Sequence, residues 1–569
     1  MRSMVLRFTL AGLVVFLNGV ACAITDGEPA GDPILQIGLV DEVLEVFPDM
    51  VPESMTDRLP IHVPRNAIAG VHVMLAGLTG KEQISVVAVA GKGKRLGVER
   101  WYRLIDVPVA ENTGLDRNTE KYSVKINPFV VRRAPFRVYD PFRPVSLPLT
   151  AESSTVVLRL EIPVPAHVPE GTYPYKIRVR CGNVTKELQF PVTVHRVTVP
   201  SLEHATTAYI NWHSLDNICS AHGVEKWSEP FWKMLAEYAR LMAKGRQNAF
   251  WFIWGEYFSF DSSGTVVAFE RARLERYIRL FQSEGLTTIH GAPLVGRRDW
   301  LGSTDMLLGV RAADGQEVHA TSPRGKHMLR EMGTRVVAMM KENHWDTRWL
   351  QGIFDEPTDE FLDRYHELVA LFRDMDPSIQ ILEATLTMSV TGDVNVWCPQ
   401  VHEYQASRAF FDKRRTAGDR VWVYTCLAPG GPWLNRLLDM ERLRQVYIGW
   451  ALAKYDLQGY LHWGFNHHTA KPFEELVRFH MEGQYLPAGD SHIVYPVKEG
   501  PLSSHRFEAH RIGMEDCEVL AQVKQRSPGR AEEIIGMVVR AFDEYDKRVP
   551  EYRRARQALL EAADVHSAP

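Results

Sequence analysis

Cysteines and metal-ligand clusters are scarce in this sequence. Only six cysteines occur in 569 residues. Five of them follow residue 23 at long, irregular spacings: Cys181, Cys219, Cys398, Cys426 and Cys517. An odd number at such spacings does not indicate a disulfide framework, and no Cys or His grouping has the spacing of zinc ligands. The sequence therefore predicts no metal site.

A strong charge of either sign is also absent. The net charge is −4, the pI is about 6.6, and charged residues make up 24% of the chain. Without a strong field or a local basic patch, we expect no nucleic-acid partner. Beyond the N-terminal segment, no apolar run reaches the roughly 18 residues that a membrane span requires, so we predict no stable membrane span.

Aromatic residues, by contrast, are plentiful: they make up 10% of the chain and include 14 Trp. Such a composition suits a large hydrophobic core, and it also suits a sugar-binding cleft lined by stacking rings. A chain of this length is too long for a single core. We therefore expect two or three domains.

The N-terminus has the features of a secretory signal. Two arginines precede an apolar run at residues 8–16, and Ala21-Cys22-Ala23 follows as an A-x-A cleavage site. Residues 1–23 are therefore predicted to direct the protein out of the cytoplasm, as a secreted or periplasmic protein. A lipoprotein anchor on Cys22 is the alternative, but Gly19 stands where such signals usually carry Leu.

Residues 32–200 are predicted to form a β-sandwich. Short runs in which apolar and polar residues alternate are separated by Pro, Gly and Asn. The clearest of these runs are SSTVVLRLEIPVP, TYPYKIRVRCG and ELQFPVTVHRVTVP. This alternation has the period of half-buried strands, and regularly spaced strands with turn signals between them are typical of a sandwich. The turn GNVT after Cys181 indicates a hairpin.

From residue 201 the pattern changes to short apolar runs alternating with longer helical patterns. Eight runs are candidate strands: TTAYINW, NAFWFIW, TTIHGAPL, WLQGIFDE, IQILEATL, VNVWCP, RVWVYTCL and GYLHWGF. Parallel strands need helical crossovers, so we predict a catalytic (β/α)8 barrel, an α/β fold, over residues 201–475. Residues 476–569 are predicted to close the barrel with amphipathic helices, among them RAEEIIGMVVRAFDEYDKRV and YRRARQALLEAADV.

The segment LQGIFDEPTDEF places two adjacent carboxylates, Asp355 and Glu356, directly after the fourth predicted strand. In a barrel of this kind the active site lies at the C-terminal ends of the strands. A helix cap at Asp355 and a solvated Glu356 are the structural alternative. The residues that follow, Pro357 to Glu360, offer better caps. The pair is therefore a candidate catalytic group.

Adjacent carboxylates do not suit a glycosidase in which two carboxyl groups face each other across the bond that is cleaved. They suit substrate-assisted catalysis, in which the 2-acetamido group of the sugar attacks its own anomeric carbon. One acid then protonates the leaving oxygen, while its neighbour orients the amide and stabilises its developing charge. We assign Glu356 as the acid/base and Asp355 as the stabiliser.

Four blocks of the sequence carry a resemblance to a known family. These blocks are IFDEP, WVYTCLAPGGPWLNRLLD, GYLHWGFNHH and YPVKEGPLSSHRFEAHRIGMEDCEVL. In this order, over residues 120–525, they resemble glycoside hydrolase family 123 and its uncharacterised relatives, the domain of unknown function 4091. The resemblance implies a β-sandwich followed by a (β/α)8 barrel, retaining exo-β-N-acetylgalactosaminidase activity by substrate assistance, and no cofactor. The family's Asp-Glu pair corresponds to Asp355 and Glu356.

Other side chains near the predicted strands are candidates for sugar contacts. A tyrosine hydroxyl can position the acetamide, a tryptophan ring can stack on a sugar face, and amides or carboxylates can bind hydroxyls. The candidates are Tyr424, Tyr404, Trp463, Trp397, Asn466, Asn248 and Glu256. Each also has an ordinary structural alternative, such as a core ring or a turn-forming Asn. For Glu515 and Asp516, beyond the barrel, we expect positions on a helix surface.

The leading hypothesis is a secreted glycosidase that removes terminal β-linked N-acetylhexosamine, for which we expect N-acetylgalactosamine, from glycans or glycolipids. Two alternatives stay open. One is a glycosidase for a different sugar, and the other is a non-catalytic carbohydrate-binding barrel. A binding protein has no reason to keep two adjacent buried carboxylates, which argues against the second alternative.

Overall fold

A computed structural model describes residues 34–565 except 123–124, 300–301 and 482. The predicted secretory signal, residues 1–23, lies outside the described residues. Within the described parts of the chain, no helix combines the length and the apolar character needed to cross a membrane. The five cysteines of these parts are all free thiols.

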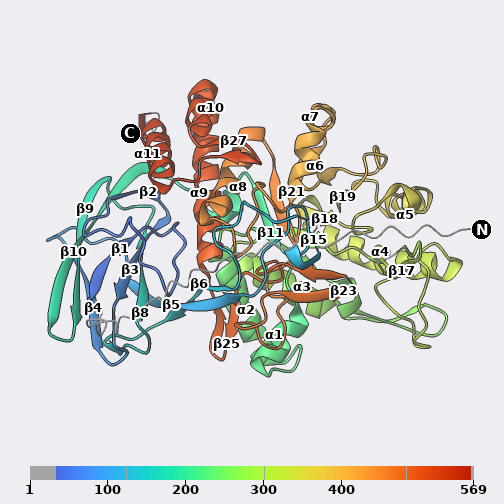
Figure 1. The fold of residues 1–569 in the computed structure, drawn as a ribbon. Helices are drawn as coiled ribbons and strands as arrows, with labels where there is room; N and C mark the ends of the chain where they lie inside the picture. The colour runs from blue at the N-terminus through green and yellow to red at the C-terminus, as the bar shows by residue number, and fades with distance from the viewer. Residues whose placement is uncertain (1–33, 123–124, 300–301, 482, 566–569) are drawn as a thin grey trace, which may run out of the picture.

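The N-terminal domain is a β-sandwich of two five-stranded sheets, drawn mainly in blue to blue-green in Figure 1. The first sheet has the order β1 (Gln36–Val40), β3 (Ala67–Ala76), β8 (Thr155–Val164), β5 (Arg100–Val109), β6 (Phe136–Pro144). The second has the order β2 (Ile61–Arg65), β10 (Val184–Thr198), β9 (Gly171–Cys181), β4 (Gln83–Ala90), β7 (Leu149–Thr150). The predicted sandwich is confirmed.

Strand β9 shows why the sandwich forms. Along it, Tyr173, Tyr175, Ile177 and Val179 are buried, while the residues between them face outward. The strict alternation places one apolar face against the opposite sheet. The hairpin that joins β9 to β10 turns at Gly182, whose φ of 56° lies in the left-handed region that glycine adopts at no steric cost.

The second domain is a parallel eight-stranded barrel, as predicted. Its strands are β11 (Ala208–Asn211), β12 (Ala249–Phe252), β15 (Thr288–Gly291), β18 (Trp349–Gln351), β19 (Gln380–Ala384), β20 (Val396–Cys398), β21 (Arg420–Tyr424) and β22 (Gly459–His462). All eight runs identified in the sequence form these strands. The last strand pairs with the first, which nearly closes the ring.

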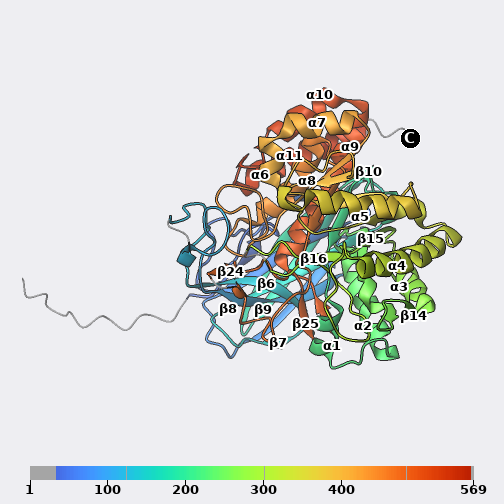
Figure 2. The ribbon, with the colours of Figure 1, turned by 90° about the vertical axis from the view of Figure 1, so that its right-hand side faces the viewer.

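Helices cover most of the crossovers between these strands. They are α1 (Leu215–His222), α2 (Glu229–Lys244), α3 (Arg271–Ser283), α4 (Pro323–Glu342), α5 (Leu362–Met375), α6 (Val401–Ala406), α7 (Arg408–Thr416), α8 (Arg442–Tyr455) and, after β22, α9 (His505–Arg526). Figure 2 shows α3, α4 and α5 side by side on the outer surface. The crossover from β19 to β20, residues 385–395, is a turn without a helix.

Short hairpins decorate the barrel. They are β13 (Phe258–Phe260) with β14 (Val266–Phe269), β16 (Val295–Arg297) with β17 (Met306–Leu308), β23 (Arg478–Met481) with β24 (Gln484–Leu486), and β25 (Tyr495–Val497) with β26 (Gly500–Leu502). The hairpin β16–β17 follows the third barrel strand. It positions the active site, as described below.

The seam between β11 and β12 lacks a regular ladder and is bridged by amide side chains. Asn248 accepts a hydrogen bond from the Tyr209 amide and donates one to the carbonyl of Thr207. Gln247 exchanges hydrogen bonds with Asn211. These contacts satisfy backbone groups that a ladder would otherwise pair.

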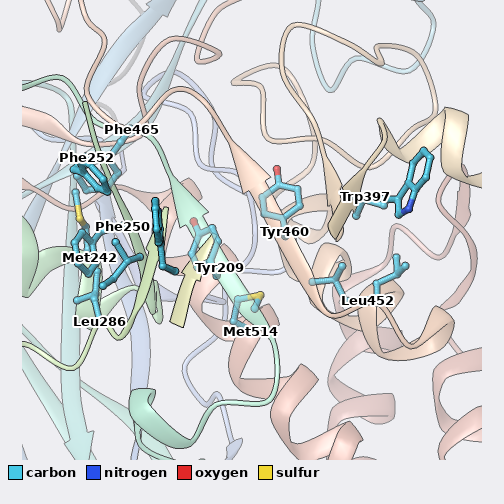
Figure 3. Close-up of a cluster of buried hydrophobic side chains, with 14 of the residues drawn as sticks. Tyr209, Met242, Phe250, Phe252, Leu286, Trp397, Leu452, Tyr460, Phe465 and Met514 are labelled. Atoms are coloured by element: carbon cyan, nitrogen blue, oxygen red, sulfur yellow. The ribbon is translucent and has the colours of Figure 1, made fainter. Parts of the chain in front are cut away.

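The main hydrophobic core lies between the strands and the helices that surround them. Figure 3 shows part of it, with Phe250, Phe252 and Met242 in one group and Trp397 near Leu452 in another. The outward side chains of the strands and the inward faces of the helices supply this layer. Ring contacts such as the parallel pair Phe250 and Phe281, with centroids 4.5 Å apart, fill it.

The C-terminal region differs from prediction at two points. The segment 530–549 was expected to be one helix, but α10 (Pro528–Gly536) ends early and a hairpin follows, β27 (Val539–Ala541) with β28 (Glu544–Tyr545). The second point concerns Glu515 and Asp516, which are buried on α9 rather than on a helix surface. Arg511 pairs with Glu515, and Arg556 of α11 (Val549–Val565) pairs with Asp516. Burial of these acids is therefore compensated by cations.

Candidate active site

The inner faces of the barrel strands form a separate cluster at the centre of the ring. Because side chains alternate along each strand, Leu461 of β22 points inward while Tyr460 belongs to the outer core. Toward the C-terminal end of the barrel, the inner cluster contains aromatic side chains that carry an N–H or O–H group: Trp212, Trp251, Tyr424 and Trp463. Trp212 and Trp251 stack with centroids 4.7 Å apart and planes 3° apart.

The carboxylate pair lies at this same end of the barrel, just past β18. Ile353 and Phe354 are fully buried, and the chain then turns through Asp355 and Glu356. Glu356 has a φ of 54°, in the left-handed region that non-glycine residues seldom adopt. Backbone strain of this kind is characteristic of functional sites, where the surroundings hold it in place.

Two side chains from neighbouring strands brace the backbone of this turn. The carboxylate of Glu383, on β19, accepts hydrogen bonds from the amides of Ile353 at 2.7 Å and Phe354 at 3.2 Å. The guanidinium of Arg297, at the end of β16, donates to the carbonyls of Asp355 and Glu356. The turn is thus held from both sides.

Glu356 is the start of a short hydrogen-bond chain across the top of the barrel. The hydroxyl of Tyr424, on β21, donates to Glu356 Oε1. Gln400 Nε2, just past β20, donates to the Tyr424 hydroxyl at 3.0 Å. Both partners come from strand ends, so the barrel itself orients the carboxyl group.

The electrostatics of the pair favour retention of a proton at neutral pH. Burial and the neighbouring charge of Glu356 raise the pKa of Asp355 to about 7, against the lowering effect of Arg297. Burial also raises the pKa of Glu356, although the Tyr424 hydrogen bond and Arg297 oppose the shift. Two buried carboxylates beside one cation share a single proton most readily, which is the state of an acid next to a base.

Among the predicted sugar contacts, Tyr424 and Trp463 belong to the inner cluster at the end of the barrel where the pair lies. Tyr424 bonds directly to Glu356, rather than standing free for an acetamide. Trp463 follows β22, is partly buried with the inner cluster, and donates its indole N–H to Asp490 Oδ1 at 3.2 Å. A partly exposed ring at this mouth suits stacking on a sugar.

Two other predicted aromatic contacts lie in the outer core. Trp397 points outward from β20, is fully buried, and donates its indole N–H to Asp419 at 2.8 Å. Tyr404 lies on α6 and is fully buried among rings that include Tyr455 and Phe542. These positions do not fit a contact with sugar, because both side chains are fully buried in the core between the strands and the helices.

The three remaining candidates also have structural partners. Asn248 precedes β12 and bridges the seam at the N-terminal end of the barrel, opposite the pair. Asn466 is fully buried and exchanges hydrogen bonds with the backbone of Ser214. Glu256 pairs with Lys226 at 2.8 Å. None of these positions is joined to the carboxylate pair by a recorded contact within the described residues.

The structure adds six residues to the candidate site that were not predicted from the sequence: Arg297, Glu383, Gln400, Trp212, Trp251 and Asp490. Asp490 is fully buried, and burial raises its pKa to about 7 although Arg436 opposes this. Only Glu383 carried a sequence signal, because an acid in the middle of the apolar strand ILEATL needs a buried partner. The others depend on contacts between distant segments.

A polar hollow of about 450 Å³ lies over the segment that follows the pair, and Asp355 and Glu356 are not among the residues that line it. It is lined by Arg297, by residues 358–361, which follow the pair, and by Leu386 and Thr387 of the helix-free crossover. Among the described residues, no cluster of three or more His, Cys, Asp and Glu side chains is arranged to hold a metal ion. The pair therefore offers proton transfer and hydrogen bonding, and Arg297 connects its backbone to the polar hollow.

Comparison with known proteins agrees with this description. A family model described as "Glycoside hydrolase 123, catalytic domain" matches residues 212–523. No curated protein matches the chain. The structure of a family 123 glycoside hydrolase from Clostridium perfringens, reported for glycolipid glycan hydrolysis, superposes with a TM-score of 0.72 at 12% identity, covering 94% of this chain and 98% of that chain.

More distant matches have much lower TM-scores. A Bacteroides ovatus GH5 xyloglucanase gives a TM-score of 0.33 at 9% identity, over 84% of this chain and 100% of its own. The β-glucuronidase 3 of Bacteroides uniformis gives 0.30 at 10% identity, over 85% of this chain and 51% of its own. TM-scores this low do not indicate a shared fold.

Proposed function

The chain belongs to glycoside hydrolase family 123 and is a glycosidase, and from this premise we propose that it is a retaining exo-β-N-acetylgalactosaminidase acting by substrate assistance. The observation that carries the proposal is the adjacency of Asp355 and Glu356 in a strained turn, with raised pKa values for both. Adjacent carboxyl groups cannot face each other across a glycosidic bond, so a second enzymic nucleophile opposite the acid is not available from this pair.

In the proposed first step, the acetamide oxygen of the substrate attacks the anomeric carbon. The single proton that the pair shares is on Glu356 in this step, and Glu356 gives it to the leaving oxygen as the glycosidic bond breaks. Asp355, ionised, accepts a hydrogen bond from the acetamide N–H and balances the positive charge that spreads over the forming oxazolinium ring. In the second step, Glu356 takes a proton from water, which attacks the anomeric carbon and reopens the ring with net retention.

Other residues supply position rather than proton transfer in this scheme. Tyr424 holds the Glu356 carboxyl by its hydrogen bond. Trp463 presents a partly buried ring at the barrel mouth, where it stacks on the sugar face. Since the Clostridium perfringens relative is described in terms of glycolipid glycan hydrolysis, we propose glycolipid or related glycans with a terminal N-acetylhexosamine as substrates.

Aryl β-glycosides with and without the 2-acetamido group test the proposal. We expect cleavage of the β-N-acetylgalactosaminide, strong inhibition by the matching thiazoline, and no cleavage of β-galactoside. A thiazoline mimics the strained cyclic intermediate and binds far more tightly than substrate. Cleavage of the plain galactoside, together with a covalent glycosyl adduct on Asp355 or Glu356, would show a different sugar and an enzymic nucleophile.

We also propose that the protein is exported. The N-terminal residues 1–23 have the order of a secretory signal. Mature protein recovered from outside the cytoplasm should begin near Ile24. Full-length protein retained in the cytosol would contradict export, and lipid labelling at Cys22 would indicate a lipoprotein instead.

A further inference from the structure

Arg297 reaches the catalytic turn from a hairpin inserted after the third barrel strand. Val295, two residues earlier on β16, forms a parallel bridge with Phe354, and its amide donates to the carbonyl of Ile353 at 3.1 Å. The hairpin therefore docks along the segment that leads into the pair. Arg297 is then carried to the level of Asp355 and Glu356.

The guanidinium is fixed by aromatic rings as well as by hydrogen bonds. Its central carbon lies 5.2 Å from the ring centroid of Phe354 and 5.1 Å from that of Phe361. One nitrogen, Nη2, donates to the carbonyls of both Asp355 and Glu356. The two rings also contact each other, with centroids 4.8 Å apart, and the planar guanidinium packs against both of them. This packing fixes Nη2 beside both carbonyls, which a flexible lysine ammonium does less well.

The backbone that Arg297 holds needs support. Glu356 has a φ of 54°, a left-handed conformation that is sterically unfavourable for a non-glycine residue. A strained conformation persists only when its surroundings over-determine it. The hydrogen bonds from Arg297 to the carbonyls of Asp355 and Glu356 hold the peptide units before and after the Glu356 Cα. They therefore help to keep Glu356 in this conformation.

Arg297 also differs in charge from the other groups that face the pair. Those groups are Glu360 after the turn, Glu383 on β19, Cys398 on β20, Glu403 on α6, and Tyr424 and Cys426 on and after β21. All of them are acidic or neutral. Within this set, the positive charge opposite Asp355 and Glu356 comes from Arg297.

From these contacts we propose that Arg297 is a positioning residue for the reaction, which clamps the Asp355–Glu356 peptide in its reactive turn and supplies the positive charge beside the two carboxylates. The inference rests on the proposed roles of the two carboxylates. It adds a residue with two separable tasks, one geometric and one electrostatic. Arg297 itself does not transfer a proton.

Two substitutions separate these tasks. Arg297→Lys keeps the charge but loses the planar group that packs on Phe354 and Phe361, so we expect kcat to fall about tenfold with little movement of the pH profile. Arg297→Met loses both, so we expect kcat/KM to fall about 100-fold, because misplacement of the acid is costly. Both limbs of its pH profile should move upward by roughly one unit, because the carboxyl pKa values rise when a nearby cation is removed.

Arg298 provides a matched control on the next residue. It is exposed and pairs with Asp305 and Glu317, away from the pair. Arg298→Met should leave both kcat/KM and the pH limbs unchanged. The thermal unfolding of all three variants is measured alongside, so that a loss of folded protein is not counted as a loss of catalysis.

Chemical rescue gives an independent readout, because Arg297 lines the open hollow of about 450 Å³. For Arg297→Ala, non-denaturing guanidinium chloride should restore part of kcat and return the pH limbs toward those of the wild type, whereas sodium chloride at equal ionic strength should not. A merely structural arginine would give neither effect.

The outcomes distinguish this inference from the proposed function. If the wild type does not cleave the aryl β-N-acetylgalactosaminide, the proposed function fails, and the sugar that it does cleave is used for the Arg297 test. If wild type is active but Arg297→Met keeps its pH limbs and loses less than about threefold in kcat/KM, the Arg297 inference is overturned. Should Arg297→Met not fold, an unchanged kcat for Arg297→Lys overturns the clamp.

Discussion

Two groups of carboxylates in this molecule differ in how many cations surround them. The first, at the contact between sandwich and barrel, is an interface network of Glu42, Arg159, Glu161, Lys244, Glu508, Arg511 and Glu515. Each acid in it has a cation within 3.0 Å. The second is the catalytic pair, in which two carboxylates face one arginine that bonds to their backbone carbonyls.

In the interface network the pKa values of Glu161 and Glu508 are lowered, whereas at Glu515 burial outweighs Arg511 and raises the pKa; at the catalytic pair both pKa values are raised. Burial alone would raise the pKa of Glu508, but Lys244, Arg511 and Arg159 outweigh it and hold that pKa below its usual range. At the catalytic pair, burial and mutual repulsion prevail, and the pKa of Asp355 rises to about 7. Several cations around one buried acid, as at Glu508, keep that acid ionised, whereas two carboxylates beside one arginine can exchange a proton near neutral pH.

The largest expected effect is on chemistry at the catalytic pair. Glu356→Gln removes the proton donor, and general acid catalysis is worth about 10²–10⁴-fold, so kcat/KM should fall by that factor on substrates with poor leaving groups. The first step on a nitrophenyl glycoside should be spared, because nitrophenolate hardly needs a proton. Steady-state and single-turnover kinetics on both substrates measure this.

A control for Glu356→Gln comes from a carboxylate that the sequence also made a candidate. Glu256 pairs with Lys226, and Glu256→Gln should leave kcat/KM close to that of the wild type. Equal losses on good and poor leaving groups for Glu356→Gln would remove Glu356 from the acid role.

In the interface network, the expected effect is on stability instead. Arg159 is fully buried and bonds to Glu42 and Glu161. Arg159→Met leaves buried acids without their partner, so the free energy of unfolding should fall by about 3–5 kcal/mol, with activity per folded molecule unchanged. Denaturant unfolding monitored by circular dichroism measures the change.

A surface ion pair of the same sheet is the control for Arg159→Met. Arg103 bonds to Glu152, whose side chain is 73% exposed. Arg103→Met should change the free energy of unfolding by less than about 1 kcal/mol. If both variants lost the same small amount, the network would not be the interface's main polar support.

Replacing a carboxylate of the catalytic pair by its amide should raise the free energy of unfolding, whereas the same replacement at Glu508 in the network should lower it. The pKa of Asp355 is higher in the folded protein than its ordinary value, so the folded state loses stability from this group as pH rises from about 4 to 7. Asp355→Asn should therefore raise the free energy of unfolding by about 2 kcal/mol at pH 8, a figure reduced from full linkage because the side chain keeps some solvent contact. It should give no gain below pH 4.

Glu508→Gln is the matched comparison for Asp355→Asn. Because the pKa of Glu508 is lowered, its contribution is present above its ordinary pKa and is lost as pH falls below it. Glu508→Gln should therefore destabilise the protein at pH 8, where Asp355→Asn stabilises it. Thermal unfolding at pH 4 and pH 8 decides the signs, and destabilisation by both substitutions would show that the pair is compensated like the network.

The fold was largely predictable because burial patterns repeat within each element. All eight barrel strands and the sandwich follow from period-two alternation and from strand-helix alternation. The segment 530–549 misled because its apolar residues, including Val538 and Phe542, have spacings that suit either a helix or a hairpin. Such ambiguity is resolved by tertiary packing rather than by local pattern.

The candidate site was predictable only where chemistry is local in sequence. Asp355 and Glu356 are adjacent and directly follow a predicted barrel strand, so their place at the active-site end of the barrel could be predicted. Trp397 was selected although its neighbour Cys398 is the residue whose side chain faces the barrel interior, and strand parity decides between them. Arg297 reaches the pair across 58 residues of sequence, and no local pattern carries such a contact.

The smallest expected effect compares the two tyrosines that the sequence placed on equal terms. Tyr424 donates to Glu356, and this hydrogen bond lowers the pKa of that carboxyl against the effect of burial. Tyr424→Phe should reduce kcat/KM about tenfold, since a hydrogen bond to a charged group contributes about 1.5–3 kcal/mol and part of that is recovered by relaxation. The pH limb that reports Glu356 should move upward.

Tyr404 has the same side chain in the outer core, and its buried hydroxyl has no hydrogen-bond partner among the residues that the structure describes. Tyr404→Phe should therefore leave kcat/KM and the pH limbs unchanged and should alter the free energy of unfolding by less than about 1 kcal/mol. Kinetics from pH 4 to 9 on both variants measure the difference. Both substitutions remove one oxygen from a buried ring. Equal effects on kcat/KM and on the pH limbs would therefore show that the hydrogen bond from Tyr424 to Glu356 does not contribute to catalysis.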